Sequence, residues 1–507
     1  MENGRRENWL IFLVILTVQC HTIGAWMFNG RPEGGKVGAP YVPKGVQLPD
    51  QQFYEFQKVN HFDGSDFRYW KQRYFVNNVT FRAGGPIFIM LGGESEANPA
   101  WLVDGAWQQY ARDHGAFLVL LEHRYYGESH PVPDLSTPNL QYLSSKQALA
   151  DIAQFVTYFK KLYIYQYLQN SSVILFGGSY AGSLAAWARS RYPYLIDGAV
   201  ASSAPMVAMM EFQDYYVGVG EALDNYNTDC STEIRNATTR MYDWWGQPDK
   251  RVLMQKIFRL CDKIDHNALL DLSVFFNNLA SNFAGVVQYN NDNREFLGKQ
   301  GTDLTIKTVC DIMTDESRGD NIQRYADVNS LILDTFGKEC LNLRYNKLAN
   351  SLNHTEWGSV SAKGSRQWLY QTCSEFGWIQ SSWSPKQPFS QWFLFPFNYT
   401  TDQCDSVFVP PRYGWSQVSD NSDETNRFYG GLNVQLSKAI FVNGIVDPWK
   451  SVSILEKTPS SRHIEIILID GTAHCADMYP PSSKDPPQLA AARSKISKTI
   501  GSWLANN

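Results

Sequence analysis

The stretch that most constrains the fold is residues 171–184, where a short apolar run leads into two glycines and a serine. Residues 173–176 predict a buried strand and residues 181–191 predict a helix. Ser179 then lies on the turn between them, beside Gly178, and glycine tolerates the positive φ and close packing that a sharp turn needs. The stretch therefore predicts a strand, a tight turn and a helix in direct succession.

This order is typical of a nucleophile elbow, in which a serine is exposed at the end of a strand. Ala181 stands where the strict motif has its last glycine, so the match is incomplete. An ordinary glycine-rich turn is the alternative interpretation. The catalytic one requires an acid and a histidine further along the chain, in that order.

The surrounding sequence predicts an α/β sheet domain. Residues 86–91, 117–121 and 198–202 are apolar on both faces, which favours central strands of a parallel sheet. Residues 106–114 and 145–163 have helical character and would connect such strands. Residues 57–62 and 70–76 alternate aromatic and polar side chains and predict edge strands.

At 507 residues the chain is long for one core, so we expect an insertion or a second domain. Residues 210–430 show helical periodicity and carry six of the cysteines, which predicts a largely helical insertion held by disulfides. The sheet pattern returns at residues 438–443 and 464–469. We expect an α/β-hydrolase domain over residues 48–209 and 431–507, with the insertion between the two parts.

The N-terminus has the features of a secretory signal peptide at residues 1–25, with two arginines before a ten-residue apolar run. Residues 26–47 are rich in glycine and proline and predict a flexible leader without a core role. Cys20 leaves with the signal, so seven cysteines remain in an oxidising compartment. Five Asn-x-Ser/Thr sites are then candidates for glycans on surface loops: Asn78, Asn170, Asn236, Asn353 and Asn398.

Two further residues complete the pattern begun by Ser179. Asp447 follows the first returning strand and His474 follows the second, so both lie where an open α/β sheet places its site. The chain order serine, aspartate, histidine is that of α/β-hydrolases. A histidine can take the serine proton, and an aspartate can orient the imidazole and stabilise its positive form. We therefore expect a catalytic triad.

An oxyanion also needs hydrogen-bond donors already in place. The backbone N–H of Tyr180 is one candidate, because it follows the nucleophile. The second is expected in the loop after residues 86–91, at Gly93 or Glu94.

Composition excludes several other classes. The net charge is −5 with no basic block, which argues against nucleic acid as a partner. The sequence lacks metal-ligand spacing of cysteines or histidines and lacks a phosphate-binding glycine motif, so we expect no metal and no cofactor. No stretch after the signal is apolar enough to predict an integral membrane segment.

Several motifs resemble the S28 serine peptidases. They are Gly177-Gly-Ser-Tyr-Ala-Gly182, Asn443-Gly-Ile-Val-Asp-Pro-Trp449, Leu91-Gly-Gly-Glu94, Glu122-His-Arg-Tyr-Tyr-Gly127 and Lys71-Gln-Arg-Tyr-Phe75. The resemblance covers roughly residues 50–500 and implies a peptide substrate, exopeptidase action and, in many members, proline before the cleaved bond. It implies Ser179, Asp447 and His474 as the triad, and Trp449 as a wall of the proline pocket. A packed turn tryptophan is the alternative for Trp449.

The resemblance also implies disulfides Cys230–Cys310, Cys261–Cys340 and Cys373–Cys404, which leaves Cys475 as the odd thiol. Two positions depart from the family: Asn60 replaces an aspartate found in many members, and Ser183 replaces a methionine near the pocket of some proline-specific ones. Ser183 is therefore a candidate substrate-binding residue that weakens strict proline preference.

Glu94 is a second candidate for substrate binding, through a substrate amine, and the alternative is a structural hydrogen bond to its own loop. Carboxypeptidase and dipeptidyl peptidase action both stay open at this point. Competing functions are a serine carboxypeptidase-like enzyme, an esterase, and a silent hydrolase-fold binding module. Lysosomal and extracellular locations, and a monomer or homodimer, also remain open.

Overall fold

The computed structural model describes residues 24–25, 27–28, 31–32, 37–291, 304–389, 393–410, 413–461 and 463–505. Apart from Gly24 and Ala25, the predicted signal peptide lies outside these ranges, as does Cys20.

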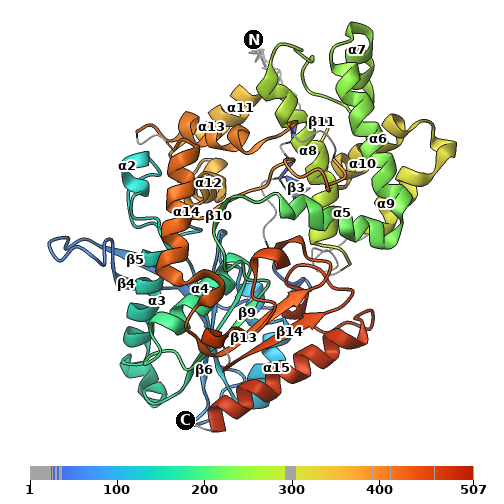
Figure 1. Ribbon diagram of the computed structural model, residues 1–507. Coiled ribbons are helices and arrows are strands. Elements are labelled where there is room, and N and C mark those ends of the chain that lie inside the picture. Colours follow the sequence, from blue (N-terminus) through green and yellow to red (C-terminus); the bar gives the residue numbers. More distant parts are fainter. Residues whose placement is uncertain are drawn as a thin grey trace, which may run out of the picture.

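One eight-stranded sheet forms the lower half of the molecule in Figure 1, with strand order β14-β13-β9-β8-β6-β7-β5-β4. All neighbouring strands from β14 to β7 in this order pair in parallel. β5 is antiparallel to both of its neighbours, β7 and β4. The strands are β4 (Gln52–Lys58), β5 (Tyr69–Asn77), β6 (Ile87–Leu91), β7 (Phe117–Leu121), β8 (Val173–Gly178), β9 (Gly198–Ser202), β13 (Ser437–Gly444) and β14 (His463–Ile469). This is an α/β-hydrolase fold, and the predicted fold class is confirmed.

Helices cover both faces of the sheet, because alternate side chains of each central strand point in opposite directions. Ile87 and Ile89 of β6 join one core with α3 (Ser145–Phe159) and α4 (Tyr180–Arg191). Phe88 and Met90 join a second core with α1 (Ala106–His114) and α15 (Pro487–Ala505). The continuous apolar runs of the sequence thus correspond to strands buried on both faces.

The expectation for residues 70–76 was partly wrong. β5 lies inside the sheet between β4 and β7, so of the two predicted edge strands only β4 is at an edge, and β4 covers Gln52–Lys58 rather than residues 57–62. Lys71 is exposed, but two other polar residues of β5 are buried and paired: Gln72 Nε2 donates to the carbonyl of Glu122 at 2.8 Å, and Arg73 Nε donates to the Glu122 carboxylate at 3.1 Å. The polar residues that suggested an edge strand therefore include Gln72 and Arg73, which bind Glu122 inside the protein instead of facing solvent.

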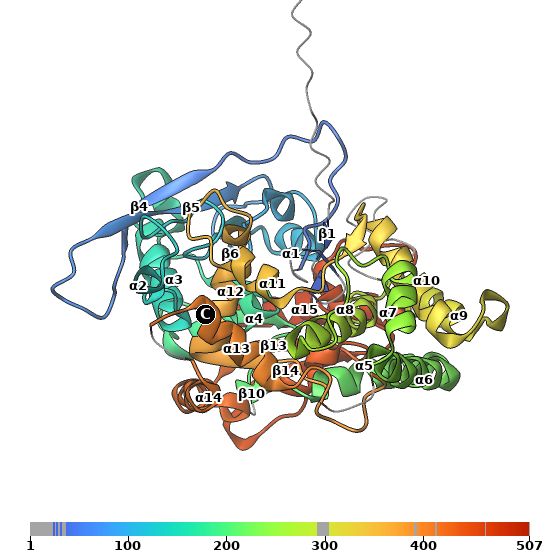
Figure 2. The same ribbon diagram turned by 90° about the horizontal axis from the view of Figure 1, so that it is seen from above.

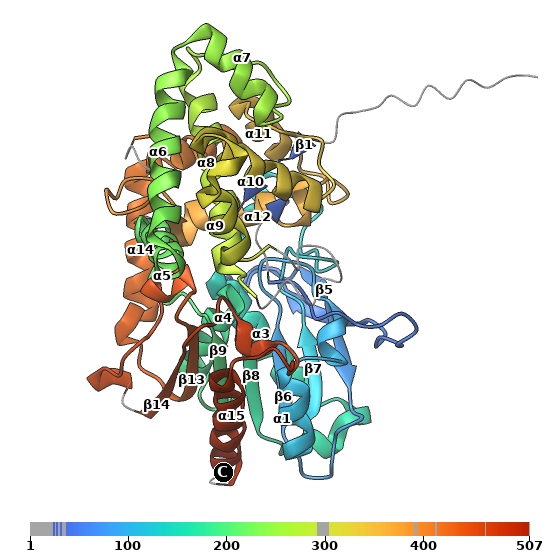
Figure 3. The same cartoon turned by 90° about the vertical axis from the view of Figure 1, so that its right-hand side faces the viewer.

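The elements between β9 and β13 are mostly helical and lie above the sheet in Figure 3, over the carboxyl ends of its strands. β10 (Met209–Glu211) and β12 (Gly377–Ile379) pair in parallel beneath them. The helices are α5 (Asp214–Tyr226), α6 (Thr228–Trp245), α7 (Pro248–Ile257), α8 (Leu269–Gln288), α9 (Ile306–Thr314), α10 (Asn321–Thr335), α11 (Tyr345–Leu352), α12 (Ser365–Gln371), α13 (Phe397–Val407) and α14 (Trp415–Tyr429).

Three disulfides link parts of this helical region: Cys230–Cys310, Cys261–Cys340 and Cys373–Cys404. These are the pairs that the family resemblance implies. Cys475 is buried and forms no disulfide. The three bonds join α6 to α9, the segment after α7 to β11 (Cys340–Leu341), and the segment after α12 to α13.

The last two residues of the predicted signal peptide and residues 37–39 of the expected leader contact the folded protein. β1 (Gly24–Ala25) pairs in parallel with β11, and Figure 2 shows β1 beside the helical region. Val37 and Ala39 pack against the core formed with α1 and α15. Tyr479 Oη donates to the carbonyl of Gly38 at 2.5 Å. Residues 37–39 therefore have a core role rather than the purely flexible one expected.

Candidate active site

Ser179 lies on the turn between β8 and α4 with φ 56° and ψ −132°, a backbone conformation that costs a non-glycine residue about 1–3 kcal/mol. A methyl group on Gly177 would overlap the carbonyl oxygen of Ala181, so the turn requires glycine there. The N–H of Ser179 donates to the carbonyl of Ser202 on β9 at 2.9 Å. Sheet pairing and small neighbours together hold the strained serine.

Asp447 and His474 form a buried pair in the loops that follow β13 and β14. His474 Nδ1 lies 2.8 Å from Asp447 Oδ2, and neither side chain is more than 1% exposed. The other carboxylate oxygen of Asp447 accepts the N–H of Trp449 at 2.9 Å, which fixes its orientation. Burial disfavours the imidazolium, but the Asp447 carboxylate and then Cys475 outweigh it and raise the pKa of His474 well above 6.5.

The loop that carries His474 packs against the elbow. The N–H of Cys475 donates to Ser203 Oγ at 2.9 Å, and Cys475 Sγ lies 3.6 Å from the carbonyl oxygen of Ser202, which also accepts the N–H of Ser179. A methyl group on Gly178 would overlap the sulfur of Met478. The loop that carries His474 thus packs against the turn that carries Ser179, and the Asp447–His474 pair lies behind it at the carboxyl ends of β13 and β14.

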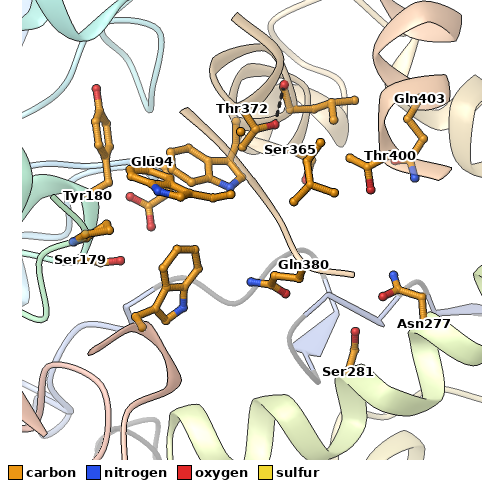
Figure 4. A pocket seen from close by; sticks show the side chains of 18 of the residues that line it. Glu94, Ser179, Tyr180, Asn277, Ser281, Ser365, Thr372, Gln380, Thr400 and Gln403 are labelled. Atoms are coloured by element: carbon orange, nitrogen blue, oxygen red, sulfur yellow. Dashed lines mark hydrogen bonds between the residues drawn. The ribbon is translucent and has the colours of Figure 1, made fainter. Parts of the chain in front are cut away.

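A cavity of about 200 Å³ opens beside Ser179 and is walled by both parts of the molecule. Figure 4 shows Ser179, Tyr180 and Glu94 on one side of it, with Asn277, Ser281, Thr400 and Gln403 on the other. The first group comes from the sheet domain and the second from α8 and α13. The insertion therefore forms the far wall of the cavity.

Three tryptophans line this cavity: Trp368, Trp378 and Trp449. The rings of Trp378 and Trp449 are perpendicular with centroids 5.9 Å apart. Trp449 Nε1 donates to Gln288 Oε1 at 3.0 Å, so the ring is held by a residue of the insertion. Trp449, which the family resemblance implies as a wall of a proline pocket, is one of the residues that line this cavity.

Sequence reasoning missed Gln288, the last residue of α8. Its backbone carbonyl accepts the N–H of His474 at 3.0 Å, while its side chain also accepts the hydroxyl of Tyr215 at 2.8 Å. It was missed because these partners come from elements far away in the sequence. Trp368 and Trp378 were assigned to packing, since a tryptophan-rich helical region gives no signal for which rings face a cavity.

The Tyr180 side chain is held by a buried network. Burial lowers the pKa of His123 to about 4, so its imidazole is neutral near pH 7. His123 Nδ1 lies 2.6 Å from the carbonyl of Arg124, which leaves Nε2 to accept the Tyr180 hydroxyl at 3.1 Å. Gln371 Nε2 donates to the same hydroxyl at 3.0 Å. The residue after Ser179 is thereby fixed from both the sheet domain and the insertion.

Other motif residues support the loop after β7. Arg124 Nε and Nη2 donate to the two oxygens of Asp151, each at 2.6 Å, with both side chains fully buried. Asp151 Oδ1 also lies 2.7 Å from His61 Nε2. Asn60 Oδ1 accepts Gln147 Nε2 at 2.6 Å, so the departure from aspartate keeps a hydrogen bond there. These motifs act on the position of the loop, away from the cavity.

Four of the predicted site residues are not among those that line this cavity: Asp447, His474, Ser183 and Gly93. Ser183 is fully buried and donates to the carbonyl of Pro205 at 2.7 Å, and Pro205 is the residue that lines the wall. Ser183 therefore lies behind the wall of the cavity rather than on its surface. Gly93 lines a neighbouring cavity beneath Glu94 and packs against Ala181.

All five glycosylation candidates are exposed. Asn236 lies within α6 and Asn398 near the start of α13, so these two are on helices rather than on the loops expected.

The family model described as serine carboxypeptidase S28 matches residues 57–496. The chain belongs to the S28 family of serine peptidases. This S28 peptidase is 33% identical to the thymus-specific serine protease of Homo sapiens, over 92% of this chain and 89% of that protein. It is 28% identical to the lysosomal Pro-X carboxypeptidase of Mus musculus, over 88% of each chain.

Among solved structures, a proline iminopeptidase of Mycobacterium smegmatis overlaps with a TM-score of 0.38 at 10% identity, over 90% of this chain and 99% of that chain, a distant likeness in overall fold. As an S28 member, the chain is a serine-type peptidase that acts on peptides. Within the described ranges of this S28 peptidase, no helix combines the length and apolar character needed to cross a bilayer.

Proposed function

We propose that this S28 peptidase cleaves peptide bonds near chain termini with Ser179 as nucleophile, His474 as base and Asp447 as its partner. The observation that carries the proposal is the position of Ser179. It stands on a strained elbow, lines the cavity, and shares the carbonyl of Ser202 with the loop that bears His474. A strained backbone at a cavity wall is typical of a catalytic residue.

The chemistry follows from these positions. Ser179 Oγ attacks the carbonyl carbon of the scissile bond while its proton passes to Nε2 of His474. Asp447 holds the opposite nitrogen and stabilises the imidazolium. The tetrahedral intermediate collapses when His474 gives the proton to the leaving nitrogen, so the C–N bond breaks and an ester remains on Ser179. Water then attacks the ester, with His474 again as base, and releases the acid.

The oxyanion formed in each half-reaction needs two donors. The N–H of Tyr180 is placed at the start of α4, beside Ser179. The second donor is proposed in the loop of Gly93 and Glu94, which reaches the cavity from the end of β6. Losing one such donor typically costs about 3–4 kcal/mol of transition-state stabilisation.

The cavity wall supports cleavage near a terminus. α8, α12 and α13 stand over the carboxyl ends of the strands. Their residues and Ser179 line the same cavity, which has a volume of about 200 Å³. The end of a peptide fits a space of this size more readily than a folded chain or a long internal loop does.

The test is peptide cleavage by the wild-type protein and by Ser179→Ala. We expect the variant to lose at least about 10³-fold in kcat. Ser190→Ala is the matched control, because Ser190 lies on the same helix and its hydroxyl bonds the carbonyl of Gln435, away from the cavity. Cleavage that persists in Ser179→Ala would contradict the proposal.

We further propose a preference for proline before the cleaved bond. The perpendicular rings of Trp378 and Trp449 form flat apolar walls near Ser179, and a pyrrolidine ring packs well on such walls. The relative named Pro-X carboxypeptidase has a name that points to the same residue. Matched peptides with proline or alanine at that position, tested with Trp449→Ala and Trp449→Phe, measure the preference. Equal rates for both peptides would overturn it.

We also propose a secretory route that ends in the lysosome or outside the cell. Three disulfides and five exposed glycosylation candidates support it, because disulfides persist in oxidising compartments. Expression in animal cells followed by glycosidase treatment should lower the apparent mass. A protein of unchanged mass that stays in the cytosol would contradict the route.

A further inference from the structure

The side chain of Gln288 connects the insertion to the wall of the cavity. Gln288 is the last residue of α8, is only 2% exposed, and is one of the residues that line the cavity. Its amide oxygen accepts Trp449 Nε1 at 3.0 Å and the hydroxyl of Tyr215 at 2.8 Å. Its amide nitrogen donates to the hydroxyl of Tyr289 at 2.8 Å. Both ends of the amide are therefore engaged inside the protein.

The chemistry of the indole fixes the orientation of this amide. An indole N–H can only donate, so the group that it meets must be the oxygen of the amide and not the nitrogen. If the Gln288 amide turned over, two donors would face each other and the hydrogen bond to Trp449 would be lost. The amide and the indole thus hold each other in one arrangement.

Ring packing alone leaves the Trp449 indole more freedom. Its ring centroid lies 5.2 Å from that of Phe212, 5.7 Å from that of Tyr215 and 5.9 Å from that of Trp378, with interplanar angles of 53°, 67° and 89°. Aromatic pairs tolerate a range of distances and tilts, whereas a hydrogen bond requires a direction. Without the Gln288 oxygen, the buried indole N–H would lack this partner and the ring would be held by packing only.

The main chain of Gln288 makes a separate contact with the site. Its carbonyl accepts the N–H of His474 at 3.0 Å, and substitution of the side chain leaves this carbonyl in place. The backbone N–H of Trp449 is likewise held independently, because it donates to the Asp447 carboxylate at 2.9 Å. The side chain of Gln288 therefore acts on the indole wall, while its main chain acts on the loop of the base.

We propose that Gln288 is a positioning residue, which fixes the Trp449 indole as a wall against which a bound peptide packs. Through this one amide, the helical insertion sets the shape of the cavity on the side of the sheet domain. The inference rests on the proposed function, because it requires that peptides bind in this cavity. It assigns Gln288 to peptide binding and not to the chemical step.

The first test is Gln288→Met, which keeps the length of the side chain and removes the amide. We expect KM for the peptide Ala-Pro-Ala-Phe to rise at least about 5-fold, the value of one net hydrogen bond. The carbonyl of residue 288 remains, so kcat and the rate at which a fluorophosphonate labels the protein should each change less than about 2-fold. An unchanged KM, or a loss that falls on kcat alone, would overturn the inference.

Gln154→Met is the matched control. Gln154 lies on α3, donates to the hydroxyl of Tyr54 at 2.8 Å, and does not line the cavity. This substitution also removes a hydrogen bond between a glutamine and a tyrosine, so it should lower stability without changing KM. A rise of KM as large as that in Gln288→Met would show a general structural effect and would overturn the inference.

A double-mutant cycle assigns the effect to the indole. Trp449→Phe keeps an aromatic ring but has no N–H to donate. In the Trp449→Phe background, Gln288→Met should change KM less than about 2-fold, because the hydrogen bond that it removes is already absent. An undiminished effect in this background would show that Gln288 acts by another route and would overturn the inference.

Failure of the proposed function gives a different result. If cleavage persists in Ser179→Ala, the assignment of the nucleophile fails and the comparison of KM values stands as before. If no peptide is cleaved, calorimetry decides: the Kd of Ala-Pro-Ala-Phe should be at least about 5-fold higher for Gln288→Met than for the wild type, and equal values would overturn the inference. If Gln288→Met does not fold, judged by its melting curve, Gln288→Asn takes its place with the same expectations, because its shorter side chain withdraws the amide from the indole.

Discussion

His474 Nδ1 lies 2.8 Å from Asp447 Oδ2, although the two residues belong to loops after different strands and are 27 positions apart. The pair meets because β13 and β14 are parallel neighbours, so their carboxyl ends lie side by side. The carbonyl of Gln288 in the insertion and the hydroxyl oxygen of Ser203, just after β9, then fix the His474 loop by accepting its backbone N–H groups. The parallel pairing of β13 and β14 therefore brings the Asp447 carboxylate next to the imidazole whose pKa it raises.

Replacing Asp447 with asparagine should leave the fold intact and lower kcat by about 10⁴-fold, because the imidazole loses the partner that sets its tautomer. The carboxylate also raises the pKa of His474, so its removal should move the rising limb of the residual pH–rate profile to lower pH. Steady-state rates between pH 5 and 9 measure both effects. Asp470→Asn, at an exposed position after β14, is the control. If the rising limb of the pH–rate profile lies at the same pH in Asp447→Asn as in the wild type, the assignment of Asp447 as the partner of His474 is contradicted.

The elbow glycines are expected to tolerate no side chain. Gly177→Ala should destabilise the protein by more than about 2 kcal/mol, because the added methyl group overlaps a backbone oxygen that cannot move aside. Gly246→Ala is the matched control, since no atom lies within 4 Å of the added group. Urea denaturation of both variants measures the difference. Equal urea midpoints for Gly177→Ala and Gly246→Ala would contradict the tight packing of the turn around Ser179.

Glu375 should make stability depend on pH. It accepts the N–H of Ser145 at 2.9 Å and the hydroxyl at 2.6 Å, and burial raises its pKa from 4.5 to about 7. A carboxyl group with a raised folded-state pKa stabilises the fold below pH 4.5, and this contribution is lost as pH rises towards 7. The slope should approach about 1.4 kcal/mol per pH unit from this group.

The measurement is the free energy of unfolding between pH 4.5 and 7 for the wild type and for Glu375→Gln. The variant resembles the protonated form, so its curve should be flatter. Asp477, whose pKa burial raises to about 6, contributes in the same direction and remains in both proteins. Parallel curves would contradict the assignment to Glu375.

The Cys373–Cys404 disulfide should affect substrate binding as well as stability. It joins the segment after α12 to α13, and these elements carry Thr372, Thr400 and Gln403 of the cavity wall. Replacing both cysteines with serine should cost roughly 3–5 kcal/mol and raise KM. The Cys230–Cys310 pair, between α6 and α9 away from the cavity, should show a similar stability loss without the KM change. Equal KM changes in the two variants would contradict the difference.

Much of the sheet domain could be predicted from the sequence because its signals are local. Residues 117–121 and 198–202 are short apolar runs bounded by polar or turn-forming residues, and they form β7 and β9 at the predicted positions. Ser179, Asp447 and His474 could be placed because each follows such a run, and the ends of parallel strands meet at one edge.

The rest depended on contacts between distant segments. Gln288 touches His474 and Trp449 only because α8 folds back over the sheet, and nothing in its local sequence indicates this. Ser183 lies behind Pro205, which lines the cavity, and a four-residue offset from Ser179 does not reveal this. The polar residues of β5 suggested an edge strand because their buried partner, Glu122, is 49 residues away from Arg73.

The most direct test of the account is to label the protein with a fluorophosphonate, whose phosphorus bonds to an activated serine oxygen as fluoride leaves, and to locate the label by peptide mass mapping. We predict one labelled peptide, with the label on Ser179, and labelling slowed at least about 10³-fold in His474→Ala. A label on any other serine, or labelling of Ser179 that is undiminished in His474→Ala, would contradict the central claim.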